Sequence, residues 1–476
     1  MAIVDRVRSV PRRARERYSS VLALPAPGGL DRALLRERPA SPYGPVPEGT
    51  REIPGDYGPR GVGHTLGYVR FGHEITRSRT ARYGPVWWWG GPLGRSVVVT
   101  GPAATREVLV NADKAFSQEG WRTLIDRFFH RGLMLLDGGE HRAHRRIMQE
   151  AFTAPRIAAY VDQAAPVVRA AVREWSGHMR LYPALKRMTL DVAARVFMDA
   201  GPQAPEINSA FVACVRGANA FVRYPLPGTR WRKGLAGRAV LERWFIEALP
   251  AKRNGTGDEL FTALCHATTP EGDRFSDADV VNHMIFLMMA AHDTSTTTAA
   301  SAAHHLGLHP QWQEKARAES LALGDEPLGV EQLRSLTTLD HIVSEALRLD
   351  APVPVVMRTA VKDTTVAGYH VPAGTRVTVA QAVNHYDPAC WEDPERFDPD
   401  RFAVPLKDRD AFVPFGGGAH KCIGMYFGRY EVLTILHEML RAHRWTSTPG
   451  VRWDNTSLPV PIGGIPVTVT DGLRPA

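Results

Sequence analysis

The chain has 476 residues, which is long enough for a large buried core, and its 44% hydrophobic and 23% charged residues are typical of a globular protein. We find no fixed-period repeat and no low-complexity block, which excludes solenoid and fibrous classes. The formal net charge is +8. The basic residues form no long run with interleaved aromatics, and this argues against a nucleic-acid-binding protein.

The sequence predicts no signal and no membrane span. The densest basic cluster, Arg6–Arg17, is not followed by the apolar run of a secretory signal. It is interpreted as a disordered tail or a surface anchor. The longest apolar run, Met284–Ala291, is far shorter than the ~20 residues of a membrane span. None of the four cysteines forms a C-x-x-C pair. We expect a cytoplasmic protein.

Local patterns predict a mainly α chain with a smaller β portion near both ends. Residues 1–50 are rich in Pro, Arg and Gly and predict a loosely ordered extension, and residues 51–476 predict a single domain. From Ala103 to Leu349 most segments predict helix. The predicted elements are, in order, strands Val86–Trp89 and Ser96–Thr100, helices from Glu140, from Asp277 past His305 and over Leu339–Leu349, strands Val355–Ala360, Thr364–Val371 and Arg376–Ala380, a helix Cys422–His443, and a β-rich tail Val451–Thr470.

The strongest local signal is the segment Phe415-Gly-Gly-Gly-Ala-His-Lys-Cys-Ile-Gly424. Glycines let backbone N–H groups turn towards the sulfur of Cys422, and the positive end of the following helix favours a thiolate. Gly424 leaves room for a flat cofactor. A Gly-rich turn with a buried cysteine is the plain alternative, and a phosphate loop lacks the required G-x-x-x-x-G-K-[ST] spacing.

This segment resembles the haem-binding pattern F-x-x-G-x-[HR]-x-C-x-G of the cytochrome P450 family at every defined position. The resemblance implies the fold of that family, an α-rich domain and a small β-rich domain around a buried haem b. Cys422 would be the iron ligand, as thiolate ligation of haem is typical of this family. Over most of the chain, it is also similar to an actinobacterial group related to sterol 14-demethylases.

A second signal is Glu345-x-x-Arg348, in a predicted helix with apolar flanks. Residues three apart share a helix face and can pair, and a buried Arg needs more than one partner. The resemblance implies a structural pair that joins the arginine of a P-[ED]-R-F motif. Two copies of that motif occur, and we prefer Arg401 over Arg396 because it is nearer to the cysteine loop.

A third signal, Ala290-Ala-His-Asp-Thr294, lies inside the long apolar helix. A threonine can bond back to the carbonyl a turn earlier and open a helix locally. A helix end or a water-facing helix is the alternative. The resemblance implies the oxygen-activation motif, with Ala290 and Ala291 beside the haem. Thr294 would hydrogen-bond the activated oxygen, and Asp293 would relay protons. Ala291 stands where the family most often has Gly.

Four cationic side chains match the family's contacts to the haem propionates. His141 and Arg145 share one face of a predicted helix. Arg358 follows the Glu345 helix, and His420 lies two residues before Cys422. A zinc site at His141 lacks a nearby third ligand, and His420 as the iron ligand is the alternative to Cys422.

The predicted substrate pocket is apolar and suits a lipophilic substrate such as a sterol, terpenoid or other polycyclic molecule. Each of its residues could equally belong to the core. By resemblance, the residues over the haem are Trp121, Phe128, Phe129, Phe286, Leu287, Val353, Val355, Val356, Val460 and Ile462.

The chain carries no dinucleotide fingerprint and no cysteine set for an iron–sulfur cluster, so electrons are expected from separate partners. The resemblance implies a ferredoxin and its reductase, with electrons from NAD(P)H and O2 as oxidant. Lys421, Arg429, Arg142 and Arg146 are candidate docking cations. We predict a monooxygenase that hydroxylates or epoxidises its substrate. A peroxygenase or isomerase, and a non-enzymatic haem sensor or carrier, are the alternatives.

Overall fold

The computed structural model describes residues 29–38, 43–44, 46–60, 63–91, 94–201, 204–220, 222–324, 328–455 and 458–471. The arginine-rich stretch Arg6–Arg17 lies outside these residues. The chain divides into two compact units. We call them the strand-rich unit (the described residues up to Ser117, with Pro354–Arg396 and Lys407–Val413) and the helical unit (Gln118–Val353, Phe397–Leu406 and the described residues from Pro414 on).

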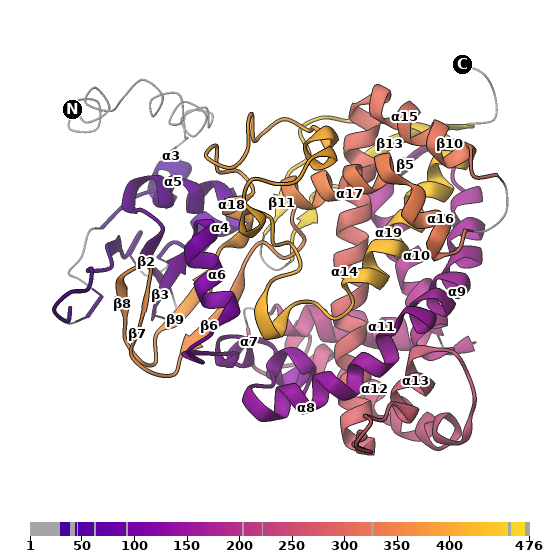
Figure 1. Ribbon diagram of the computed structural model, residues 1–476, viewed down its shortest axis with the longest axis horizontal. Coiled ribbons are helices and arrows are strands. Elements are labelled where there is room, and N and C mark those ends of the chain that lie inside the picture. The colour runs from indigo at the N-terminus through magenta and orange to yellow at the C-terminus, as the bar shows by residue number, and fades with distance from the viewer. Residues whose placement is uncertain are drawn as a thin grey trace. The chain divides into compact units, whose positions relative to one another are not determined.

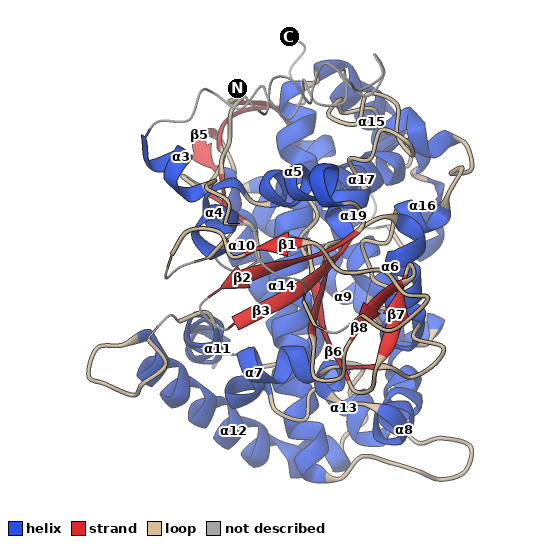
Figure 2. Cartoon of the chain, turned by 90° about the vertical axis from the view of Figure 1, so that its left-hand side faces the viewer, coloured by secondary structure: helices blue, strands red, loops and turns tan. Residues whose placement is uncertain are grey.

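The strand-rich unit is built on a six-stranded sheet with the order β1-β2-β3-β9-β6-β4 (Figure 2). Pairs β1–β2 and β3–β9 are parallel, and the other pairs are antiparallel. Its core is made of β-branched side chains, since Val97, Val99, Val377 and Val379 are all fully buried. The strands are β1 (Gly55–Asp56), β2 (Val86–Gly91), β3 (Gly94–Val99), β4 (Phe116–Ser117), β6 (Val356–Ala360) and β9 (Arg376–Val379).

One predicted strand of this unit, Thr364–Val371, is instead a hairpin of β7 (Thr364–Val366) and β8 (Tyr369–Val371). Ala367 and Gly368 both have positive φ, 49° and 78°, which is the geometry of a two-residue hairpin turn. The pattern hid this turn because Ala rarely adopts positive φ. The helices of this unit are α3 (Gly29–Leu34), α4 (Thr65–Phe71), α5 (His73–Tyr83), α6 (Pro102–Val110) and α18 (Gln381–Asn384).

The helical unit is organised around the long helix α14 (Asp277–Leu308), which Figure 1 shows passing among the other helices of that unit. Ser276 caps the helix by accepting the N–H of Asp279 at 3.2 Å. The other helices are α7 (Glu119–Phe129), α8 (Gly138–Gln149), α9 (Ala154–Arg173), α10 (Leu181–Ala193), α11 (Ala204–Ala218), α12 (Arg230–Asn254), α13 (Leu260–His266), α15 (Pro310–Leu321), α16 (Val330–Ser335), α17 (Thr337–Leu349) and α19 (Met425–Ala442).

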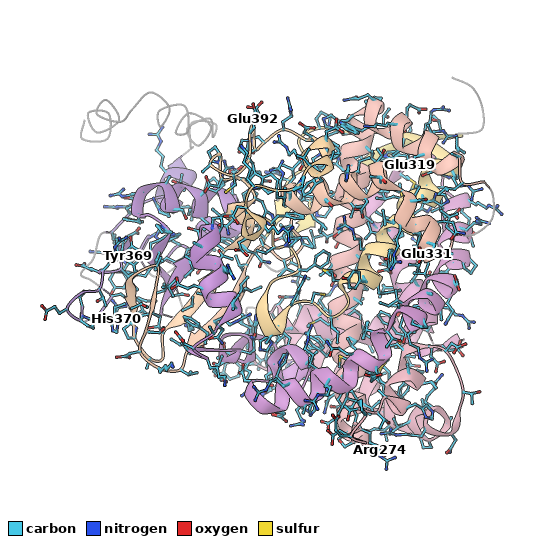
Figure 3. The ribbon with its side chains drawn as sticks, viewed as in Figure 1. Arg274, Glu319, Glu331, Tyr369, His370 and Glu392 are labelled. Carbon is cyan, nitrogen blue, oxygen red and sulfur yellow. The ribbon has the colours of Figure 1, made fainter. Side chains whose placement is uncertain are left out.

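A side chain from a neighbouring helix caps the start of α17. Glu319, labelled in Figure 3, accepts the N–H groups of Thr338 at 2.9 Å and Leu339 at 3.1 Å.

The helical unit also contains short strands. The strand β5 (Gly177–Arg180) interrupts the stretch that was predicted as mostly helical, because it pairs with β13 (Pro466–Asp471), which also pairs with β10 (His443–Ser447). A short pair joins β11 (Trp453–Asp454) to β12 (Val460–Pro461). None of the described helices is long and apolar enough to span a bilayer.

Candidate functional site

The Cys422 loop ends in the helical unit just before α19. The N–H of Cys422 donates to the carbonyl of Phe415 at 2.9 Å, which closes the loop. Gly416 and Gly418 have φ of 69° and 63°, so the loop needs glycine at both places. The helix begins at Met425, three residues later than predicted. Cys422 therefore precedes the first helical turn rather than lying in it.

The side chain of Cys422 is accessible, and opposing effects act on the pKa of its thiol. Burial by the surrounding protein raises the pKa of its thiol, whereas the backbone N–H of Gly424 and the guanidinium of Arg145 lower it. The side chain nevertheless keeps exposed surface. A metal cation bound to the sulfur would favour the thiolate over the thiol, because a metal-coordinating thiol loses its proton. A side chain at Gly424 would meet nothing within 4 Å, so there is open space beside the sulfur's loop.

The middle of α14 presents a second accessible surface. Nearly all of this helix is buried, yet Ala290 is exposed and Ala291 and Thr294 are half-buried. Residues spaced by three and four positions share a helix face, so both alanines lie on the side of Thr294. The hydroxyl of Thr294 donates to the carbonyl of Ala290 at 2.9 Å, as expected for a threonine inside a helix. An accessible face halfway along a buried helix indicates space for a ligand.

The helix that follows the cysteine loop, α19, packs on α14 beside this face. Gly428 of α19 lies against Ser295, with 3.8 Å between an ideal Cβ position and the serine Oγ. Ser295 follows Thr294 directly in the sequence. The helix that begins after Cys422 therefore packs on α14 one residue from the predicted oxygen-activation threonine.

Asp293 is buried and pairs with a residue that the sequence analysis did not identify. Its carboxylate lies 2.9 Å from Nζ of Lys186 on α10 and 3.1 Å from Nε2 of His292. Burial lowers the pKa of His292 to about 4, so this imidazole is neutral near pH 7. Lys186 carried no local signal, because its partner is 107 residues away in the chain.

Helix α8 brings imidazole and guanidinium groups to the cysteine loop. The rings of His141 and His420 are stacked with their centroids 3.8 Å apart. Nε2 of His420 lies 3.9 Å from the carboxylate of Asp137, just before α8. A shallow cavity of about 290 Å³ beside them is lined by His141, Arg142, Arg145, Arg146, Gln149, Gly418 and Ala419.

These residues fit an iron porphyrin. The accessible thiol of Cys422 supplies an iron ligand, the open space at Gly424 and the accessible face of α14 admit a flat ring, and Arg145 with the paired imidazoles suits carboxylate groups. Arg358 is buried in β6 of the strand-rich unit, so its predicted propionate contact stays a prediction.

The pair Glu345–Arg348 is fully buried in α17. Two hydrogen bonds of 2.7 Å join the guanidinium to the two carboxylate oxygens, and the N–H of Asp398 adds a bond of 2.9 Å to Glu345. Nε of Arg401 lies 3.4 Å from Oε1 of Glu345. The other motif copy differs, because Arg396 pairs with Asp393 at 4.0 Å within the strand-rich unit.

The predicted pocket residues fall into three groups. Phe128 is fully buried, stacks edge-on against Trp231 at 4.9 Å and closely contacts Gly217 and Gly234, so it belongs to the packing of α7, α11 and α12. Phe129, Phe286 and Leu287 are also buried in the helical unit. Surface remains at Trp121, Val353, Val460 and Ile462, while Val355 and Val356 belong to the strand-rich unit.

Glu431 on α19 is a second polar residue that the sequence analysis missed. Burial raises its pKa to about 7, and its hydrogen bond to Ser295 opposes this only in part. The second carboxylate oxygen has no partner in the described residues. A carboxyl on a helix with apolar neighbours gives no signal of its depth, since one glutamate in an amphipathic helix usually faces water.

Comparison with known proteins gives a consistent result. The family model described as Cytochrome P450 matches residues 61–228 and 245–463. Cytochrome P450 136 of Mycobacterium tuberculosis is 43% identical over 90% of each chain. Cyclooctat-9-en-7-ol 5-monooxygenase of Streptomyces melanosporofaciens is 29% identical over 82% of this chain and 88% of its own. The structure of retinoic acid-bound cyanobacterial CYP120A1 superposes with a TM-score of 0.81 at 26% identity, over 90% of this chain and all of that one.

The expected fold, a helix-rich portion with a small strand-rich portion, is confirmed by this structural match. The family match and a monooxygenase among the relatives also confirm the expected class of enzyme, an oxidoreductase that uses haem and O2. The chain belongs to the cytochrome P450 family of monooxygenases.

Proposed function

We propose that this chain hydroxylates or epoxidises a lipophilic small molecule, such as a sterol, a terpenoid or another polycyclic compound. Haem b would be held by Cys422, and electrons would come from NAD(P)H through a ferredoxin and its reductase. The observation that carries the proposal is the accessible thiol of Cys422 together with the accessible face of α14, joined through the contact of Gly428 with Ser295.

Each site residue has a proposed task towards the cofactor. The Cys422 thiolate would bind the iron, and Phe415, Gly424, Ala290 and Ala291 would line the site that takes the ring. The carboxylates of the haem propionates would be held by His141, Arg145, Arg358 and His420. When bound, the haem supplies the activation of O2, which the side chains cannot supply themselves.

Proton delivery is the proposed task of Asp293 and Thr294. The Thr294 hydroxyl bonds to the carbonyl of Ala290 at 2.9 Å but keeps exposed surface, so a rotation lets it donate into the site. The carboxylate of Asp293 lies 2.9 Å from Nζ of Lys186, and the lysine side chain is 30% exposed. Release of this contact would let the carboxyl carry a proton between water and Thr294.

The substrate class is supported by the relatives. Cyclooctat-9-en-7-ol and retinoic acid, named with two of them, consist mostly of hydrocarbon with few polar groups. The predicted pocket residues that keep surface, Trp121, Val353, Val460 and Ile462, are apolar. Apolar lining favours a lipophilic ligand.

Docking of an acidic ferredoxin is proposed at the surface around α8 and the cysteine loop. Arg142 and Lys421 are exposed there. Two other predicted docking cations are already bound: Arg429 contacts Asp340 at 2.5 Å, and Arg146 lies 3.5 Å from Glu271. Arg142 and Lys421 are therefore the better candidates.

The spectrum of the reduced, carbon monoxide-bound protein tests the haem ligand. We expect a strongly red-shifted Soret band that is lost in Cys422→Ser and kept in Cys390→Ser, which alters a half-buried cysteine outside the helical unit. A band typical of histidine ligation, unchanged in Cys422→Ser, would remove the cysteine as ligand. The oxygenase proposal would fail with it.

Turnover with a ferredoxin, its reductase and NADPH tests the reaction. With a substrate found by its effect on the ferric spectrum, Thr294→Ala should consume NADPH while forming little product. Thr298→Ala is the matched control, because Thr298 makes the same bond to the carbonyl a turn earlier but is buried. Unchanged coupling in Thr294→Ala, with peroxide-driven turnover, would favour a peroxygenase instead.

A further inference from the structure

A pair of histidines joins α8 to the first half of α14 (Figure 1). Nδ1 of His144 and Nε2 of His283 share a hydrogen bond of 2.8 Å. His283 is fully buried, whereas His144 is half-buried. The side chain of Phe275 packs against both rings, with centroid distances of 5.4 Å to His144 and 4.7 Å to His283. Because Phe275 and His283 are both buried, water competes little for this bond.

Both imidazoles of this pair are neutral near pH 7. Burial lowers the pKa of His283 to about 3 and also lowers the pKa of His144. A neutral imidazole has one N–H and one acceptor nitrogen, so one ring can donate to the other. The charged groups that act on His144 are Arg131, Asp279 and Glu140, and Arg131 contacts each of the two carboxylates at 2.9 Å. The neutral histidine pair needs no counter-charge from this cluster.

The burial of His283 depends on its bond to His144. Nδ1 of His283 is buried and has no hydrogen-bond partner among the described residues. Without His144, both ring nitrogens of His283 would be unsatisfied, and each unsatisfied buried group costs free energy. The bond therefore fixes His144, and with it α8, to one place on α14.

Helix α8 makes little contact with α14 apart from this pair. Among the described elements, it packs most on the short helices at its two ends, η1 (Leu133–Leu135) and η2 (Glu150–Phe152). A second link to α14 is the bridge in which Arg131 contacts Glu140 of α8 and Asp279 of α14. Arg131 and Glu140 are 43% and 45% exposed, and exposed ion pairs contribute little. The buried histidine pair is therefore the stronger of the two links.

The same face of α8 carries two of the proposed propionate contacts. His141, His144 and Arg145 are spaced by three and four positions and so share a helix face. The ring of His141 stacks on His420 at 3.8 Å, and the guanidinium of Arg145 lowers the pKa of the Cys422 thiol. A shift of α8 relative to α14 would displace these groups together, because they are attached to one helix.

We propose that the pair His144–His283 positions α8 on α14 and thereby keeps His141 and Arg145 in place beside the cysteine loop. The two histidines are positioning residues, because they act through the helix. This inference rests on the proposed function, in which His141 and Arg145 hold the haem propionates. The alternative is that the pair only fills the interior and stabilises the whole helical unit.

Haem release and hydrogen exchange of the full-length, haem-loaded chain test the proposal. We expect His144→Leu and His283→Leu to lose haem to an excess of apomyoglobin about tenfold faster than the native chain, since each variant removes one partner of a buried hydrogen bond. In the same variants the backbone amides of α8 should exchange about tenfold faster, while those of α9 and α19 keep their native rates.

Two conservative variants separate the hydrogen bond from the rest of the side chain. His144→Asn places an amide at the position of Nδ1, and His283→Gln places one near the position of Nε2, so each can keep the bond. Both variants should release haem and exchange α8 amides at native rates. Arg131→Gln is the matched control, because it breaks the exposed link between the same two helices, and it should change both rates by less than about twofold.

Several results would overturn the positioning role. Native haem release in the leucine variants would do so, and so would equally faster exchange in every helix, which indicates general destabilisation. If a leucine variant does not fold, the amide variants decide, because about tenfold faster haem release in both of them would contradict the role of the bond. The carbon monoxide spectrum keeps the proposed function apart. A red-shifted Soret band with native haem release would remove the positioning role alone, whereas a histidine-type band in the native chain would remove the proposed function as well.

Discussion

Two buried ion pairs of the helical unit use the same kinds of groups and differ in how tightly they are held. Glu345 and Arg348 have no exposed side-chain surface and share two hydrogen bonds of 2.7 Å. Asp293 and Lys186 make one contact of 2.9 Å, and their side chains are 10% and 30% exposed. The first pair is closed off from water, whereas water reaches the second. Burial and the number of contacts therefore separate a pair that fixes the fold from a pair that can open.

Glu431 extends this comparison to a buried carboxyl that pairs with no cation among the described residues. Its pKa is raised to about 7 by burial, while the Ser295 hydroxyl is its polar neighbour. An ionised carboxylate in an apolar interior is costly, and protonation of the carboxylate removes this cost. The three carboxyls show how the partner decides the state: a bidentate arginine fixes the charge, a mobile lysine permits exchange, and without a cation the proton stays.

The largest effect is expected for Glu345→Gln. The variant removes the carboxylate charge that accepts two hydrogen bonds from the buried Arg348 guanidinium, and breaking a buried pair costs about 3–5 kcal/mol. We expect the full-length chain to unfold at much lower urea concentration, followed by loss of haem. Glu331→Gln is the control, because Glu331 pairs with Arg334 at the surface at 2.8 Å, with an 80% exposed side chain. Equal denaturation midpoints of the two variants would show that the Glu345 pair does not fix the fold.

The next effect concerns stability against pH at Glu431. The folded pKa of about 7 is above the ordinary value of 4.5, so the native state binds an extra proton between these values and its stability falls as pH rises through that window. Glu431→Gln removes this loss. Its free energy of unfolding should gain on the native protein by up to about 3 kcal/mol between pH ~4.5 and pH ~8.

A second glutamate of α19 provides the contrast for that experiment. Glu438 is buried too, but Arg169 donates to it at 3.0 Å. Glu438→Gln should therefore destabilise the protein near neutral pH, because it removes the partner of a half-buried arginine. If Glu431→Gln tracks the native pH profile, the carboxyl is ionised in the folded state and the comparison fails.

The third effect is expected in turnover. Asp293→Asn keeps the shape of the side chain and an acceptor for Lys186 but cannot carry a proton. We expect product formation to fall about 100-fold, which is the lower end for removing a positioned proton-transfer group, together with a larger solvent isotope effect. Asp279→Asn in the first turn of the same helix, where the carboxylate contacts Arg131 at 2.9 Å, should keep the native isotope effect. A native isotope effect in Asp293→Asn would remove the proton-relay role.

Much of the fold followed from local patterns. The apolar helix from Asp277 past His305 and the strand at Arg376 were predicted within a few residues, because their hydrophobic periodicity matches their burial. The hairpin at Ala367 and the strand β5 were missed. A turn formed by a non-glycine residue at positive φ and a strand whose partner is far along the chain have no local signature.

The site divides in the same way. Cys422, Glu345 and Thr294 belong to short motifs, so the sequence alone could single them out as candidates. Lys186 and Glu431 could not be found, since their significance depends on which helices pack together. Phe128 looked like a candidate for a cavity wall, but the glycines Gly217 and Gly234 bring α11 and α12 so close that it fills their contact.

The smallest effect is expected for Lys186→Gln, and it is the most direct test of the open pair. Asp293 keeps its carboxyl in this variant, so turnover should fall by less than about tenfold, well short of the loss in Asp293→Asn. The double variant should be no slower than Asp293→Asn alone, because two residues that act through one contact are not additive. A Lys186→Gln defect as large as that of Asp293→Asn would instead mean that the lysine must stay in place throughout the reaction. The Asp293 pair would then be a fixed structural element, and its 30% exposed lysine would no longer distinguish it from the Glu345 pair.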